Sequence, residues 1–215
     1  MKAFFASLAL PLLAAAAPVS DAAQSNPNFG VMAVRSASPI HYMQMNAAGQ
    51  KFWLGGTTSS YCPTQVGVNC PLATRPSLQL AATPWYVTLH LPFPLLHSGF
   101  GRHRLLRPDV EVPGGQQVYV DPTGALSFTQ AHSASIPAGS LVGSLSYEPG
   151  NPWSHYTVNG WGASGFMACP TDDNRWQVFA AMSNATVPSG NVADCLGFSA
   201  VALTYKGDVP AWQYI

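Results

Sequence analysis

The stretch FMACPTDDNRWQVFAAMSNATVPSGNVADCLGFSA, residues 166–200, indicates what kind of fold this chain adopts. It opens with the short apolar run FMAC, crosses a polar turn at 170–174, and returns as RWQVFAAM, in which apolar and other residues alternate. A loop of small polar residues follows, and another apolar run begins at Cys195. Alternation with a period of two on both sides of a turn is typical of a β-hairpin. The stretch therefore predicts a hairpin followed by a closing strand.

Two more segments show the same pattern. IHYMQM leads into a turn at 46–49 and returns as QKFWLGG, and QQVYV leads into a turn at 121–124 and returns as ALSFTQ. Pro122 and Gly124 suit the second and fourth positions of a type I turn. FGVMAVRS, which begins at residue 29, adds an opening strand. Because helix signals are nearly absent after the N-terminal segment, the expected fold class is all-β.

The spacing of the three turns indicates how the strands are arranged. The turns begin near residues 46, 121 and 171, and the intervals become about 42 and 50 residues when an unusual segment, 75–107, is left out. Near-equal intervals favour a single compact antiparallel domain, a barrel of the β-trefoil type. A two-sheet β-sandwich accounts for the same strands and is the alternative.

The N-terminus has the layout of a secretory signal peptide. Lys2 precedes an apolar run over 3–17, and small residues follow. We expect a signal peptide over 1–17 with cleavage between residues 16 and 23, and one β domain over 24–215. The apolar run is too short to span a bilayer comfortably, so no membrane association is expected after cleavage. The mature chain is expected outside the cell.

The chain carries unusually little charge. Nine basic and nine acidic residues make up 8% of the 215 and give a formal net charge of zero, whereas charged residues are usually ~25% of a chain. This balance gives no electrostatic basis for binding nucleic acid. Hydroxyls, amides or attached glycans must then supply solubility, unless the protein is packed into an extracellular matrix.

The four cysteines, Cys62, Cys70, Cys169 and Cys195, are an even number in an exported chain, which predicts two disulfides. Three pairings are possible. We favour Cys62–Cys70 and Cys169–Cys195, because each pair closes a short loop between predicted strands. Zinc would require closely spaced cysteines or neighbouring histidines, so no metal site is expected, and the sequence indicates no cofactor.

Catalytic patterns are weak. Ser164 and Ser199 lie beside glycines, but neither has the G-x-S-x-G spacing of a nucleophile turn. The six histidines show no metal-binding spacing. A glycosidase needs a pair of carboxylates, and those in predicted turns suit the capping of backbone amides instead. The candidate carboxylates are Asp121, Glu148, Asp172, Asp173 and Asp194.

Two tryptophans and one asparagine are candidate surface sites. Trp153 and Trp161 lie among Pro and Gly in NPWSHYTVNGWG, where exposure is expected. The more usual role of such tryptophans is in the core or in anchoring a loop. Exposed aromatic rings can also stack on sugar rings, so both are candidate carbohydrate contacts. Asn184-Ala185-Thr186 is an N-glycosylation sequon in a predicted surface loop.

Residues 75–107 differ from the rest of the chain. The segment RPSLQLAATPWYVTLHLPFPLLHSGFGRHRLLR holds four of the nine basic residues, no acidic residue, and four prolines that interrupt helices and strands. We expect an irregular insertion outside the folded core. It is either a surface insertion or an intron wrongly translated, although WYVTLHL could pair as a short strand.

Several segments in order resemble one known family: VRSASPIHYMQMNAAGQKFWLGG, SYCPTQVGVNCP, DVEVPGGQQVYVDPTGALSFTQAHSASIPAGS and FMACP…WQVFAAM…CLGFSAVAL. They are similar to secreted fungal cell-wall proteins of the PhiA type, some of which are known as IgE-binding proteins. The similarity covers about 29–74 and 109–203. It implies structural paired cysteines, a secreted or cell-wall location and a connection with asexual sporulation structures, and it implies no established enzymatic activity.

We therefore expect a non-enzymatic structural or surface glycoprotein of the fungal cell wall, allergen-like in its family. Wall polysaccharide or other wall proteins are the expected partners. The first alternative is a carbohydrate-binding β domain that docks on wall polysaccharide through exposed Trp and Tyr. The second is a secreted hydrolase with a cryptic carboxylate pair.

Overall fold

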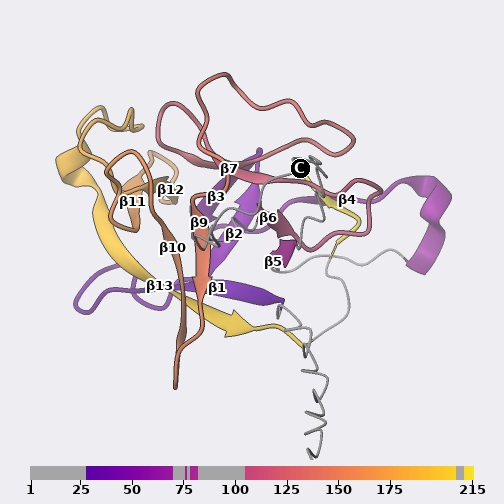
Figure 1. Cartoon of the computed structure of the whole chain (residues 1–215), viewed down its shortest axis with the longest axis horizontal. Helices are drawn as coiled ribbons and strands as arrows, with labels where there is room; N and C mark the ends of the chain where they lie inside the picture. The colour runs from indigo at the N-terminus through magenta and orange to yellow at the C-terminus, as the bar shows by residue number, and fades with distance from the viewer. Residues whose placement is uncertain (1–27, 70–75, 77, 82–104, 207–210) are drawn as a thin grey trace, which may run out of the picture.

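A computed structural model describes residues 28–69, 76, 78–81, 105–206 and 211–215 (Figure 1). The described residues form β-strands and two short 3-10 helices, and no helix among them is long and apolar enough to cross a membrane. The all-β prediction is confirmed. In chain order the elements are β1 (Phe29–Val34), β2 (Met45–Ala48), β3 (Lys51–Leu54), β4 (Ser60–Tyr61), η1 (Thr64–Asn69), β5 (Leu78–Ala81), β6 (Leu105–Pro108), β7 (Val118–Val120), β8 (Leu126–Phe128), β9 (Leu145–Glu148), β10 (Ser154–Val158), β11 (Phe166–Pro170), β12 (Trp176–Ala180), η2 (Val192–Asp194), β13 (Leu196–Thr204) and β14 (Gln213–Tyr214).

Twelve of these strands form one antiparallel sheet in the order β6-β5-β1-β13-β11-β12-β3-β8-β7. β2 pairs with β3, β10 pairs with β13, and β9 pairs with β10, so these three strands branch from the main path. The first and last strands of the path, β6 and β7, lie next to each other, which nearly closes the sheet into a barrel. β4 and β14 form a small second sheet. The chain therefore has the predicted barrel rather than the two-sheet sandwich.

The three predicted hairpins are present and pair with one another. β3 pairs with β12 at Leu54↔Trp176 and with β8 at Lys51↔Ser127. An isolated bridge, Ala125↔Phe179, joins the β7–β8 hairpin to β12. The pairings thus form a triangle, the threefold arrangement of hairpins that the turn spacing predicts.

The turn of the first hairpin lies later than predicted. β2 continues through Ala48, and the chain reverses at Gly49 and Gln50, both with positive φ, as in a type I′ turn. Asn46, which resembles a turn residue in the sequence, is buried, and its amide donates to the carbonyls of Gln44 and Gly55. The prediction of a turn at 46–49 is wrong because this side chain satisfies backbone groups inside the fold.

Most buried apolar residues form one large cluster inside the barrel, and a smaller second cluster holds Ala125, Met167, Cys169, Phe179 and Val187. Along β1, buried residues alternate with half-buried ones, as expected for a strand with one face on the core. Phe29 is fully buried against Tyr147 and Tyr156, with ring centroids 5.0 and 5.8 Å apart. Burying a side chain of this size stabilises the fold by roughly 2–3 kcal/mol.

The prediction that 75–107 is irregular is wrong at both ends of the segment. β5 pairs with β6 along its length and with β1 at Leu78↔Phe29, and Leu78 is only 2% exposed. Pro76 precedes β5, and Pro108 ends the edge strand β6, positions where the missing amide donor costs little. Residues 82–104, which include WYVTLHL, lie outside the described residues, so that part stays a prediction.

Candidate functional site

β13 changes its pairing partner along its length, and a hollow opens where it does. Leu196 to Phe198 pair with β11, whereas Ala200 to Ala202 pair with β10. Ser199 lies at the point of change. A hollow of about 270 Å³ forms there, lined by residues of β9, β10, β11 and β13 and of the loop before β11.

The hollow gathers several polar side chains. Ser199 Oγ lies 3.2 Å from Nδ1 of His155, and Glu148 is the cross-strand partner of His155. Ser164 lies on the rim. The two serines that the sequence analysis considered separately are thus brought to one place, together with a histidine and a carboxylate. Only the pairing of β10 with β13 would have linked these residues, and this long-range pairing cannot be predicted from local sequence.

A hydrogen bond between serine and histidine is the first requirement of nucleophilic catalysis, but not the whole of it. The histidine must also be oriented by a third group, and hydrogen-bond donors must be positioned to stabilise an oxyanion. Ser199, His155 and Glu148 are all exposed. In this open position the three polar side chains are accessible to solvent, and the half-buried Phe198 lines the same hollow.

The candidate carboxylates are spread over the surface or held in structural contacts. Asp173 and Arg175 form an ion pair in the turn between β11 and β12, and hydrogen bonds from Arg175 and Thr171 lower the pKa of Asp173 to about 2. Asp172 is exposed in the same turn, and Asp194 belongs to η2.

Asp121 is the centre of a polar cluster that the sequence analysis missed. Its carboxylate accepts hydrogen bonds from Lys51 Nζ and from the Thr123 backbone amide, while Lys51 Nζ also donates to Ser127 Oγ at 2.8 Å. Burial raises the pKa of Asp121, but the hydrogen bonds from Lys51 and Thr123 and the charge of Lys51 outweigh it, so the pKa is lowered. The cluster joins the first hairpin to the second across 70 positions of sequence.

Trp153 and Trp161 are exposed by 58% and 44%. They lie at opposite ends of β10, whose five residues span roughly 13–16 Å at about 3.3 Å per residue. The two rings therefore belong to separate surface sites rather than to one flat row. Their contact with carbohydrate stays a prediction.

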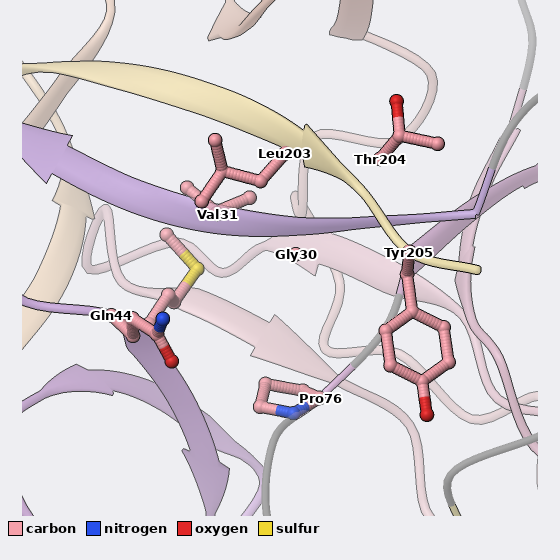
Figure 2. A pocket seen from close by; sticks show the side chains of 8 residues that line it. Gly30, Val31, Gln44, Pro76, Leu203, Thr204 and Tyr205 are labelled. Carbon is pink, nitrogen blue, oxygen red and sulfur yellow. The ribbon is translucent and has the colours of Figure 1, made fainter. Parts of the chain in front are cut away.

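A second hollow of about 240 Å³ lies where β1 begins and β13 ends, beside the residues that lead into β2 (Figure 2). Its walls are mostly apolar, and the side chains of Gln44, Thr204 and Tyr205 are the polar groups in view. Among the residues that the structure describes, its lining holds no carboxylate, histidine or lysine. The hollow is suited to holding an apolar group rather than to acid–base chemistry.

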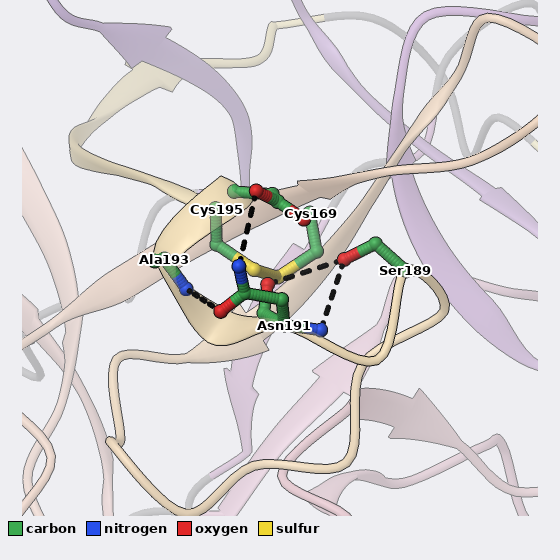
Figure 3. Close-up of a disulfide and its surroundings, with 6 residues drawn as sticks. Cys169, Ser189, Asn191, Ala193 and Cys195 are labelled. Atoms are coloured by element: carbon green, nitrogen blue, oxygen red, sulfur yellow. Dashed lines mark hydrogen bonds between the residues drawn. A yellow bond between two sulfur atoms is a disulfide. The ribbon is translucent and has the colours of Figure 1, made fainter.

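The Cys169–Cys195 disulfide is present, as predicted, with the two Cα atoms 4.2 Å apart (Figure 3). It ties β11 to the residue that precedes β13. Asn191 orders the loop beside it, since its Oδ1 accepts from the Ala193 amide and its backbone carbonyl accepts from Ser189 Oγ. Cys70 lies outside the described residues, so the Cys62–Cys70 pairing stays a prediction.

Asn184 is exposed in the loop between β12 and η2, the placement that an N-linked glycan requires. The backbone amide of Thr186 donates to the carbonyl of Thr123 at 2.8 Å, which fixes the sequon against the turn of the second hairpin. Glycosylation itself stays a prediction.

The nearly closed barrel and its disulfide define an all-β protein whose chain carries little charge. The chain belongs to the PhiA-like secreted protein family, which it matches over residues 29–90 and 97–215. It is 43% identical to an uncharacterized secreted protein of the fungus Arthroderma benhamiae over 219 residues, covering 100% of both chains. No solved structure matches it.

These matches confirm the family and the extracellular location. They also correct the expected extent of the similarity. The family match includes residues 75–90 and 97–107, which the resemblance found in the sequence does not cover. The ends of that segment, β5 and β6, are accordingly both part of the sheet and part of the matched region.

Proposed function

We propose that this secreted protein is a non-enzymatic structural component of the fungal cell wall. It is held there by contacts between the wall and a protein surface that is poor in charge and bears exposed aromatic rings. The observation that carries the proposal is the exposure of large aromatic side chains on a rigid, stapled barrel. Tyr42, Tyr61 and Trp153 are each at least 50% exposed. Exposed rings of this kind stack on sugars or on other proteins.

The charge of the chain supports the same proposal. A net charge of zero and only 8% charged residues leave little electrostatic repulsion between copies or between the protein and a matrix. Non-ionic contacts would then dominate retention. The resemblance to PhiA-type proteins adds a finer element, a role in the walls of asexual sporulation structures.

Fractionation of a fungal culture tests the proposal. The tagged full chain is expressed in a fungal host, and the medium is compared with the wall fraction, which is the protein that hot detergent releases from washed walls. We expect most of the protein in the wall fraction. Recovery of all of it from the medium would contradict the proposal.

The alternative, a carbohydrate-binding domain, is favoured by one observation. Trp153 stands exposed next to the tip of the β9–β10 hairpin, clear of the core. A pull-down on insoluble wall glucan and chitin separates this alternative from a purely structural role, with Trp153→Ala as the test variant. Val142→Ala, which changes an exposed but non-aromatic residue, is the matched control.

Binding that Trp153→Ala abolishes and Val142→Ala keeps would establish the carbohydrate-binding role. A chain that stays wholly in the supernatant would exclude it. Release of reducing sugar from purified walls, lost on substitution of one candidate carboxylate, would overturn both non-enzymatic roles.

A further inference from the structure

We propose that Asn184 carries an N-linked glycan whose first sugar packs against the indole of Trp161, so that this tryptophan serves the protein's own glycan and not an external ligand. The inference rests on a hollow that both residues line. It is independent of whether the protein is retained in the wall.

The hollow has a volume of about 420 Å³ and is built from separate segments of the chain. Pro122 comes from the turn of the second hairpin, Gly139 from the loop before β9, and Trp161 from the turn after β10. Met182 and Asn184 come from the loop after β12. The acceptor nitrogen and the exposed ring therefore share one open concavity of a size suited to a sugar.

Trp161 is held in an unfavourable backbone conformation. The Ala163 amide donates to the Gly160 carbonyl at 2.8 Å, and the central residues, Trp161 and Gly162, have φ of +51° and +77°. These are the features of a type I′ turn, which favours Gly, Asn or Asp at both central positions. Strained residues persist where the surroundings hold them, and they cluster at ligand contacts. A tryptophan placed this way and left 44% exposed points to a partner for its ring.

The sequon loop is fixed in place, so that Asn184 keeps its position beside the hollow. Gly124 has φ of +93°, and a Cβ there would lie 3.1 Å from Ala185 Cβ, which shows how closely the loop packs on the turn. Met182 is buried beneath the loop. Asn184 and Thr186 are both exposed.

The chemistry is that of N-glycosylation in the secretory pathway. A lipid-diphosphate-linked oligosaccharide is the co-substrate. The Asn184 amide nitrogen forms a bond to C1 of the first N-acetylglucosamine, the bond from C1 to the diphosphate oxygen breaks, and the nitrogen loses one proton. The C–H face of that sugar can then cover the indole, an apolar contact of the kind aromatic rings favour.

The first experiment asks whether the glycan is present. The full chain is secreted from a glycosylating fungal host, and the tryptic peptide that contains Asn184 is analysed by mass spectrometry with and without enzymatic deglycosylation. We expect a glycan on Asn184. Only the unmodified peptide would overturn the proposal.

The second experiment asks where the glycan lies, using variants matched at the sequon. Thr186→Ala destroys the sequon and Thr186→Ser keeps it, while both retain the backbone contact of this residue to Thr123. Hydroxyl-radical footprinting then measures the labelling of each tryptophan. Trp153, at the other end of β10, is the internal reference.

We expect Trp161 to be labelled several-fold faster in Thr186→Ala and in Asn184→Gln than in the wild-type protein and in Thr186→Ser, with Trp153 unchanged. Trimming the glycan to its first sugar should preserve the protection. A glycan on Asn184 that leaves the labelling of Trp161 unaltered would overturn the contact. Equal changes at both tryptophans would indicate a general structural change and would also overturn it.

Discussion

The hairpins β11–β12 and β9–β10 have similar lengths but very different surroundings. β11–β12 lies inside the sheet, with β13 on one side and β3 on the other, and the disulfide of Cys169 ties it to the start of β13. Arg175 at its turn lies over the Trp53 ring, 4.1 Å from the centroid. Among the described strands, β9 pairs only with β10, which pairs with β13, so β9 lies on a branch of the sheet. Next to the tip of this hairpin, Trp153 is exposed.

The two hairpins also differ in how their polar groups are satisfied. The turn of β11–β12 is closed by hydrogen bonds among Thr171, Asp173 and Arg175. In β9–β10, the hydroxyls of Ser146 and Tyr156 are buried without a hydrogen-bond partner among the described residues. We therefore expect β9–β10 to be locally less stable than β11–β12. Two candidate binding features, Trp153 and the Ser199–His155 hollow, lie on or beside β9–β10.

The largest expected effect comes from removing the Cys169–Cys195 disulfide, which ties the β11–β12 hairpin to β13. The double variant Cys169→Ala/Cys195→Ala should lower the free energy of unfolding by about 3 kcal/mol, because the disulfide restrains a 26-residue span in the unfolded chain. Urea unfolding followed by tryptophan fluorescence measures the loss.

The control is Cys62→Ser/Cys70→Ser, whose predicted bridge spans a shorter loop and should cost less. Peptide mapping without reduction should show Cys62 linked to Cys70. If the unfolding midpoint is unaffected by the loss of Cys169 and Cys195, the stability of the β11–β12 hairpin does not depend on its disulfide.

The next test concerns two ion pairs in the well-paired half of the molecule. Asp121→Asn should cost about 2 kcal/mol at neutral pH, because it weakens charged hydrogen bonds inside the hairpin triangle. Asp173→Asn removes a fully exposed carboxylate, and surface pairs of this kind contribute little. We expect no measurable change in its midpoint.

The pH dependence follows from the lowered pKa of Asp121. A carboxyl group whose pKa is lower in the folded state stabilises the fold above its unfolded pKa of about 3.9, and this contribution is lost as the pH falls through the folded pKa. The wild-type and Asp121→Asn unfolding curves should therefore converge in acid. If Asp121→Asn and Asp173→Asn lower the free energy of unfolding equally at neutral pH, the expected difference between the two ion pairs is contradicted.

The strands of β11–β12 could be predicted from sequence, whereas β9–β10 was not predicted. The surroundings of neither hairpin could be predicted. Alternation around a turn is local information, so the hairpins at 121–124 and 170–174 were identified closely. The pairing of β1 with β13 joins opposite ends of the chain, and the contact of Lys51 with Asp121 spans 70 positions. Such partners are set by how the whole chain packs.

Local signals also misled where tertiary contacts prevail. Asn46 is typical of a turn, but it is buried in β2, where its amide finds backbone carbonyls. The prolines of 75–107 suggested irregular structure, yet β5 and β6 form between and beside them. The disulfide pairing of Cys169 with Cys195 was predicted correctly because loop length limits the choices. The hollow at Ser199 could not be predicted, since it depends on where the pairing partner of β13 changes from β11 to β10.

The smallest expected effect lies within the β9–β10 hairpin itself, at the cross-strand pair Tyr147↔Tyr156. Tyr147 Oη donates to Ser154 Oγ at 2.9 Å, whereas the Tyr156 hydroxyl is buried and unpartnered among the described residues. An unpaired buried hydroxyl costs about 1 kcal/mol or more, and a hydrogen bond is worth about 1 kcal/mol. Tyr147→Phe should therefore destabilise the protein slightly, while Tyr156→Phe should leave its stability unchanged or raise it by up to about 1 kcal/mol. Urea unfolding of the two matched variants checks the difference, and a loss for Tyr156→Phe as large as that for Tyr147→Phe would show that its hydroxyl is satisfied after all and that the two hairpins do not differ in this way.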